Sequence, residues 1–186
     1  KLRIMKTSKI LLAALLIGGL LGSAFAKHHK KGGQSLFQQT FLATYAGETD
    51  KMVSLAEAFT AEGMEWRPAE GVRSVREAIL HVAGANYGLG ARFLGKEMPE
   101  GINPRQFNKT IKSKEDTIKV LKDSIQFVKE AVGGLDEASL GESIKLFGND
   151  SSKMGAVLVL GGHAYEHLGQ LIAYARSSGV VPPWSM

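Results

Sequence analysis

Apolar residues recur at helical spacing in four stretches of the chain. Spacings of three, four and seven residues place successive side chains on one face of a helix. The pattern predicts helices over about residues 35–62, 75–94, 113–133 and 151–177. The stripes comprise Phe37, Phe41, Tyr45, Met52, Leu55 and Phe59, then Val75, Ile79, Val82 and Leu89, and then Ile118, Leu121, Ile125, Val128 and Val132.

Local signals support the ends of these helices. Ser74 and Glu77 form a capping-box pair, in which each side chain bonds the other residue's backbone N–H. Ser151 or Ser152 is expected to cap the last helix, and Gly179 to stop it. Residues 95–112 form a long connection, and a short extended piece is expected at 143–147. The chain is therefore predicted to be all-α, a four-helix bundle with one or two long crossing connections.

The first 26 residues are expected to be a cleavable signal peptide. Four cations precede a twelve-residue apolar run, and Ala24-Phe25-Ala26 is a small-residue cleavage signal. The run is shorter than the about 20 apolar residues of a membrane span, so a retained N-terminal anchor is the alternative. We divide the chain into a signal peptide (1–26), a flexible basic leader (27–34) and a bundle domain (35–186). A secreted or periplasmic protein is expected, without a stable membrane span in its mature part.

Charge and cysteine content narrow the choice of partners. Removing the four cations of the signal segment from the net charge of +5 leaves about +1. No basic stripe is interleaved with aromatic residues, so a nucleic-acid partner is not expected. The chain has no cysteine, so nitrogen and oxygen would have to hold any metal.

Three of the five histidines carry the candidate chemistry. His28 and His29 belong to the basic leader. His163 and His167 are four residues apart, so they project from one face of a helix, and His81 lies on an earlier helix. Three protein ligands and an open position are typical of catalytic zinc sites. Imidazole also suits nickel and iron, so we expect a divalent transition metal of open identity. The alternative is that these are ordinary core or surface histidines.

The sequence offers four further candidate site residues, Glu166, Gln170, Asn86 and Tyr45. The HxxEH run matches an inverted zinc-peptidase motif whose glutamate, here Glu166, is a general base. That class needs a downstream acid, and no Asp or Glu follows His167. A surface charge is the alternative role for Glu166. Gln170 is expected to orient a ligand histidine or to contact a bound ligand. Asn86 and Tyr45 are expected to line a pocket, with core packing as the alternative.

Two blocks of sequence resemble the DinB family. One is WRPAEGVRSV at 66–75 followed by ILHV at 79–82, and the other is HAYEHLGQLIAYAR at 163–176 followed by GVVPP at 179–183. The resemblance spans about residues 35–186. It implies a DinB-like four-helix bundle with an unusual crossing, often a homodimer. The family's three metal-binding histidines match His81, His163 and His167. Some members of that family are transferases or isomerases that use a small-molecule thiol. The predicted export signal is a departure from the family.

These observations favour a metal-dependent hydrolase or thiol-type transferase acting on a small molecule. Its substrate is expected to enter near residues 95–112. The alternative is a non-catalytic metal-binding or stress-related scaffold protein. Each glycine inside the last helix costs about 1 kcal/mol relative to alanine. We therefore expect a close neighbour at Gly162 or Gly169, beside the metal site.

Overall fold

The computed structural model describes residues 33–185, so the predicted signal peptide and most of the leader lie outside the described residues. The α-helices are α1 (Leu36–Ala58), α2 (Val75–Leu94), α3 (Phe107–Thr110), α4 (Lys114–Gly133) and α5 (Lys153–Ser177). The strands are β1 (Ser143–Leu146) and β2 (Asn149–Ser152). Short 3-10 turns lie at Gly63–Glu65, Pro104–Gln106, Ala138–Gly141 and Pro183–Ser185.

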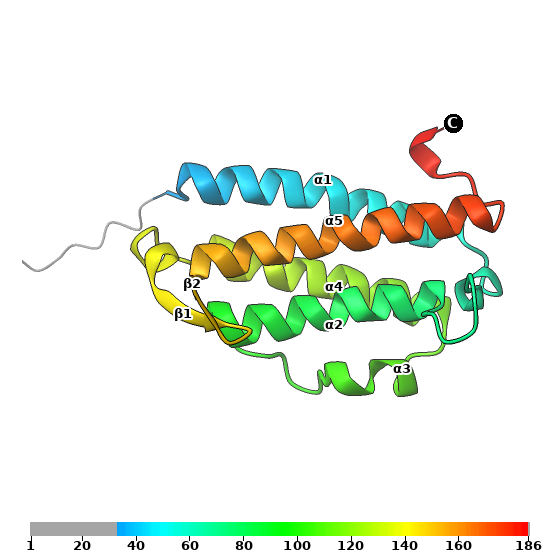
Figure 1. Cartoon of the computed structure of the whole chain (residues 1–186), viewed down its shortest axis with the longest axis horizontal. Coiled ribbons are helices and arrows are strands. Elements are labelled where there is room, and N and C mark those ends of the chain that lie inside the picture. Colours follow the sequence, from blue (N-terminus) through cyan, green and yellow to red (C-terminus); the bar gives the residue numbers. More distant parts are fainter. Residues whose placement is uncertain (1–32, 186) are drawn as a thin grey trace, which may run out of the picture. The chain divides into compact units, whose positions relative to one another are not determined.

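The four long helices form a bundle (Figure 1). Helices α1 and α5 run in one direction, and α2 and α4 run in the other. Because α2 and α4 are parallel, residues 95–113 must return along the bundle before α4 begins, and α3 lies on this return. The predicted all-α bundle with a long crossing connection is confirmed. None of the described helices is long and apolar enough to cross a membrane.

Each long helix begins after a serine whose side chain accepts a backbone hydrogen bond. Ser35 and Ser74 complete capping boxes, with Gln38 and Glu77 reaching back to them. Ser113 caps α4, and Ser152 caps α5. Such a cap satisfies a backbone donor that the first helical turn leaves unpaired. The predicted starts of these helices therefore agree with the structure to within one or two residues.

The buried apolar side chains form two clusters. The larger cluster fills the space between the four long helices. The smaller one lies where the crossing connection covers α2 and α4, and its buried members are Leu80, Ala83, Tyr87, Phe107, Val120 and Phe127. Helix α2 is thus packed on two sides, which fixes its orientation between the bundle and the crossing.

A β-hairpin joins α4 to α5. Strands β1 and β2 are antiparallel, with Ser143 opposite Ser152. Phe147 and Gly148 form the turn with φ of 51° and 89°, a left-handed conformation that is unusual for phenylalanine. The sequence predicted an extended piece at β1 but not its partner strand.

The expected close neighbour at Gly162 or Gly169 is wrong. A Cβ atom at either position would meet no atom of the described residues within 4 Å, and both glycines are exposed. Gly161 is the packed glycine instead, since a Cβ there would lie 3.1 Å from the Phe41 ring.

Candidate metal centre

The three histidines outside the leader converge between α2 and α5. His81 lies in the second turn of α2, and His163 and His167 occupy successive turns of α5. The Nε2 atom of His163 is 3.1 Å from Nε2 of His81 and 3.1 Å from Nε2 of His167. The candidate ligand atoms of all three lie within 4.8 Å of one another. The structure thus brings together all three residues that the sequence singled out as metal ligands.

This geometry fits a divalent transition metal. Two nitrogens that each lie 2.0–2.1 Å from a tetrahedral ion are about 3.3 Å apart, close to the spacing of these Nε2 atoms. Nitrogen atoms that close to one another without a shared proton or cation repel, because their lone pairs meet. His167 is buried, whereas His81 and His163 are partly exposed. The site therefore has a side that is open to solvent.

Gln170 holds His167 in the form that a metal requires. The Nδ1–H group of His167 donates to Oε1 of Gln170 over 2.7 Å, which leaves the Nε2 lone pair facing the other two histidines. Gln170 in turn donates to the Tyr174 hydroxyl over 2.9 Å. The Tyr174 ring contacts Trp66 edge-on, with centroids 5.4 Å apart. The prediction named Gln170 but not Tyr174, although its spacing of four residues on one helix signals the contact.

Burial and nearby charges favour the neutral forms of His81 and His163. Burial lowers the pKa of His163 to about 4, with further contributions from His167, His81 and Arg73. Burial, Arg73 and His167 also lower the pKa of His81, whereas Glu166 acts in the opposite direction. Neutral histidine is the form that binds a metal ion, so little proton release is needed at neutral pH.

Two exposed charges lie near the histidines. Arg73 is close enough to lower the pKa of His81 and His163, and Glu166 close enough to raise that of His81. Neither side chain makes an ion pair or a side-chain hydrogen bond within residues 33–185. The candidate general base is thus near the site and exposed, without a hydrogen bond that fixes it there.

The other two candidate pocket residues lie in the core of the bundle. Asn86 is buried and donates to the Ser124 hydroxyl over 3.0 Å. Tyr45 is buried and stacks on Phe41, with centroids 5.4 Å apart, beside an apolar groove between α1 and α5. No hydrogen bond or ring contact in the described part of the chain joins either of them to a histidine.

The 95–112 connection lies on another face of α2. Its apolar residues pack with Leu80, Ala83 and Tyr87, whereas His81 faces α5. The substrate entrance expected near this connection stays a prediction. The charged residues near the histidines are Arg73, which precedes α2, and Glu166 of α5.

Comparison with known proteins agrees with this architecture. A family model described as the DinB superfamily matches residues 44–171. The chain belongs to the DinB superfamily. Among solved structures, a DinB-like protein from Bacillus cereus ATCC 10987 matches with a TM-score of 0.68 and 17% identity, over 78% of this chain and 95% of that one. A search of curated proteins gives no match.

Two further structures of DinB-like proteins show the same fold. One, from Bacillus subtilis, has a TM-score of 0.62 and 19% identity, over 76% of this chain and 93% of that one. The other, from Exiguobacterium sibiricum 255-15, has a TM-score of 0.60 and 23% identity, over 79% and 95%. At these identities the likeness establishes the DinB-like bundle, while the chemistry has to be argued from the site.

Proposed function

We propose that this member of the DinB superfamily binds one divalent transition metal, which could be zinc, nickel or iron, through His81, His163 and His167. The observation that carries the proposal is the convergence of three Nε2 atoms, two pairs of which are 3.1 Å apart. The Gln170 hydrogen bond supports it, because a hydrogen bond to the other ring nitrogen orients a metal-binding histidine.

We further propose that the metal-loaded protein is an enzyme, a hydrolase or a thiol-type transferase with a small-molecule substrate. A bound metal would supply Lewis acidity, which lowers the pKa of a coordinated water or thiol. The partly exposed His81 and His163 leave access from solvent. Arg73 would attract a negatively charged part of the substrate, and Glu166 is the nearby carboxylate that could accept a proton. The competing proposal is a non-catalytic metal-binding protein, favoured by the lack of a carboxylate hydrogen-bonded to any of the three histidines in residues 33–185.

Metal content tests the first proposal. Protein freed of metal, reloaded and dialysed should carry about one ion per chain by elemental analysis, and the His81→Ala/His163→Ala/His167→Ala variant should carry none. His28→Ala/His29→Ala is the matched control, because it removes the histidines of the leader. Full metal content in the triple variant would refute the proposal.

A turnover screen tests the second proposal. Metal-loaded protein would be assayed with hydrolysable esters, amides and thiol conjugates, beside the triple alanine variant. Activity that disappears with the histidines supports the enzyme. Full metal occupancy without turnover of any substrate would favour the binding protein.

Export and self-association are separate proposals. Export rests on the pattern of residues 1–26, and N-terminal sequencing of the protein from its native host should begin at Lys27. A longer N-terminus in membrane fractions would favour the anchor. The homodimer rests on the family resemblance, and sedimentation of the purified protein at several concentrations would test it.

A further inference from the structure

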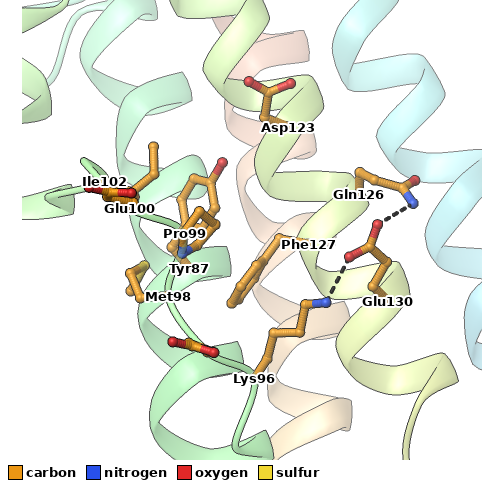
Figure 2. A pocket seen from close by; sticks show the side chains of 11 residues that line it. Tyr87, Lys96, Met98, Pro99, Glu100, Ile102, Asp123, Gln126, Phe127 and Glu130 are labelled. Atoms are coloured by element: carbon orange, nitrogen blue, oxygen red, sulfur yellow. Dashed lines mark hydrogen bonds and ion pairs between the residues drawn. The ribbon is translucent and has the colours of Figure 1, made fainter.

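A second pocket lies on another face of α2 from the one that carries His81. It has a volume of about 650 Å³ and lies between α2, α4 and the start of the crossing connection (Figure 2). We call it the α2–α4 pocket, and none of its lining residues belongs to the histidine site. A volume of this size is typical of small-molecule sites.

The floor of the α2–α4 pocket is aromatic. The rings of Tyr87 and Phe127 lie with centroids 5.0 Å apart and planes tilted by 52°. Met98, Pro99 and Ile102 from the crossing connection add apolar surface. An aromatic face carries partial negative charge, so such a floor accepts both apolar groups and cations.

The rim of the pocket is acidic. Four carboxylates line it, those of Glu97, Glu100, Asp123 and Glu130, against the single cation Lys96. Asp123 and Glu130 pair with Lys119 and Lys96, respectively. Glu97 and Glu100 form no ion pair within residues 33–185. The pocket therefore has an excess of negative charge.

Lys96 shows that this surface can hold an ammonium group. Its Nζ atom is 2.7 Å from Glu130 Oε2 and 5.8 Å from the centre of the Phe127 ring. One carboxylate and one aromatic face thus bind a primary ammonium at one end of the pocket. Tyr87 and Asp123 offer the same two kinds of group at the other end (Figure 2).

Tyr87 provides a polar group without a partner. Tyr87 is only 2% exposed, and its side chain lines the pocket. Within residues 33–185 its hydroxyl makes no hydrogen bond. Burial, and to a lesser degree the Asp123 carboxylate, raises the pKa of Tyr87, which places this carboxylate nearby. The Tyr87 hydroxyl lines the pocket and makes no hydrogen bond to the described residues, so it can donate to or accept from a ligand.

We propose that the α2–α4 pocket binds a small organic ammonium ion with an apolar body. The apolar part would lie on the Tyr87 and Phe127 rings, and the charged group would face Asp123 and Glu100. An ammonium donates hydrogen bonds, which the Tyr87 oxygen and the carboxylates accept. This site does not depend on the proposed metal centre.

Three probes of similar shape test the charge requirement. Phenethylammonium, neutral 2-phenylethanol and anionic phenylacetate would be titrated into the full chain by calorimetry and by protein amide chemical shifts. The ammonium should bind at least about tenfold more tightly than the alcohol, and phenylacetate should not bind. Binding of the ammonium should weaken as salt is added. Equal affinity for the ammonium and the alcohol, or no binding of the ammonium at 10 mM, would overturn the proposal.

Variants locate the site. Glu100→Gln/Asp123→Asn should weaken binding of phenethylammonium by about tenfold, since two carboxylates near the charge are neutralised. The matched control Glu115→Gln/Glu137→Gln removes the same charge from exposed positions elsewhere and should change affinity less than about twofold. Phe127→Leu, checked for folding by its melting curve, should cost about fivefold through the lost aromatic face. His167→Ala should bind the probe normally. Unchanged affinity in the Glu100/Asp123 variant would refute the site.

Discussion

Helix α2 contributes to two sites of contrasting chemistry. On one face, His81 meets two histidines of α5, and no carboxylate of residues 33–185 is hydrogen-bonded to the three imidazoles. On another face, Tyr87 lies in a pocket whose rim holds four carboxylates. The first site is suited to bind a cation through nitrogen lone pairs at fixed positions. The second is suited to attract a cation through carboxylate charge and aromatic faces, which do not require the cation to occupy one fixed position.

The two sites also differ in how they are held. Two of the three proposed metal ligands lie one turn apart on α5, and Gln170 fixes one of them. The α2–α4 pocket is built from two helices and a connecting segment, and its ion pairs are on the surface. Surface ion pairs contribute little energy, typically about 0–1 kcal/mol. Metal removal and single substitutions should therefore affect one site without affecting the other.

Metal removal should give the largest effect. A metal at 1,000 times its dissociation constant stabilises the folded chain by about 4 kcal/mol, provided that the unfolded chain does not bind it. Thermal melts with and without chelator should show this difference in the wild type and lose it in His167→Ala. Glu100→Gln/Asp123→Asn should keep it. A chelator effect of equal size in His167→Ala would show that the metal binds elsewhere.

Crowding the floor of the α2–α4 pocket should have the next largest effect. A Cβ atom at Gly90 would lie 2.7 Å from the Phe127 ring, so Gly90→Ala must displace that ring. Overpacking of this kind costs about 1–3 kcal/mol. Urea unfolding should show the loss, and metal content should not change.

Gly88→Ala is the matched control for Gly90→Ala. It lies on the same helix, and a Cβ atom there would meet no atom within 4 Å. Its unfolding free energy should stay equal or rise. A similar loss of stability in both variants would point to the helix backbone rather than to the Phe127 ring.

The contrast between the two sites explains what the sequence could predict. Apolar stripes and serine caps encode the long helices locally, so their positions agree with the structure. The spacing of His163 and His167 is likewise local, and Gln170 follows within one turn. That His81 joins them depends on how α2 packs against α5, which the spacing alone does not reveal.

Features made from separate segments could not be predicted in this way. Strand β2 is polar, and its pairing depends on the left-handed turn at Phe147 and Gly148. The α2–α4 pocket combines residues 87–102 with residues of α4, without any motif. The expected neighbour of Gly162 or Gly169 is wrong because helical spacing does not say which face of α5 has a neighbour.

The hydrogen bond of Gln170 gives the third prediction. Gln170→Leu removes the acceptor for His167 Nδ1–H, and loss of such a partner lowers metal affinity by about 10–100-fold. Competition with a chelating dye would measure this change. The matched control is Gln126→Leu, which removes a glutamine that lines the α2–α4 pocket and should leave metal affinity unchanged. Equal metal affinity in the two variants would exclude an orienting role for Gln170.

The first turn of α2 gives a prediction about the stability of the fold. Arg76 is buried and joins Glu65 at 2.5 Å, and it also donates to the Ile111 carbonyl in the crossing connection. The hydrogen bond from Arg76, aided by the charges of Arg76, Arg67 and Lys112, lowers the pKa of Glu65 below its ordinary value of 4.5. Folding therefore favours the ionised carboxylate. Its stabilising contribution is present above pH 4.5 and is lost as the pH falls through the lowered pKa.

Glu65→Gln tests this linkage. Because the carboxylate is about half exposed, the expected loss of stability at pH 7 is only about 1 kcal/mol. The difference from the wild type should shrink as the pH is lowered below 4.5, in melts followed by circular dichroism. Glu137→Gln, an exposed control, should show no such pH dependence. A difference that stays constant down to pH 2 would mean that the ion pair does not contribute to stability.

The outward face of α5 gives the smallest expected effect. Gly162 and Gly169 have open space where a side chain would be, and alanine is the better helix former. Gly162→Ala and Gly169→Ala should therefore each raise the unfolding free energy by about 0.4–1 kcal/mol, with unchanged metal content and unchanged ammonium binding.

Leu158 and Tyr165 are also exposed on this helix, so a second copy of the chain could pack there. If it does, the added methyl groups would hinder close contact and lower the stability of the dimer. Unfolding measured at two protein concentrations distinguishes these outcomes, because only a dimer makes stability depend on concentration. A concentration-independent gain in both variants would confirm that this face is free, whereas a loss that grows with protein concentration would show that the glycines lie in an interface.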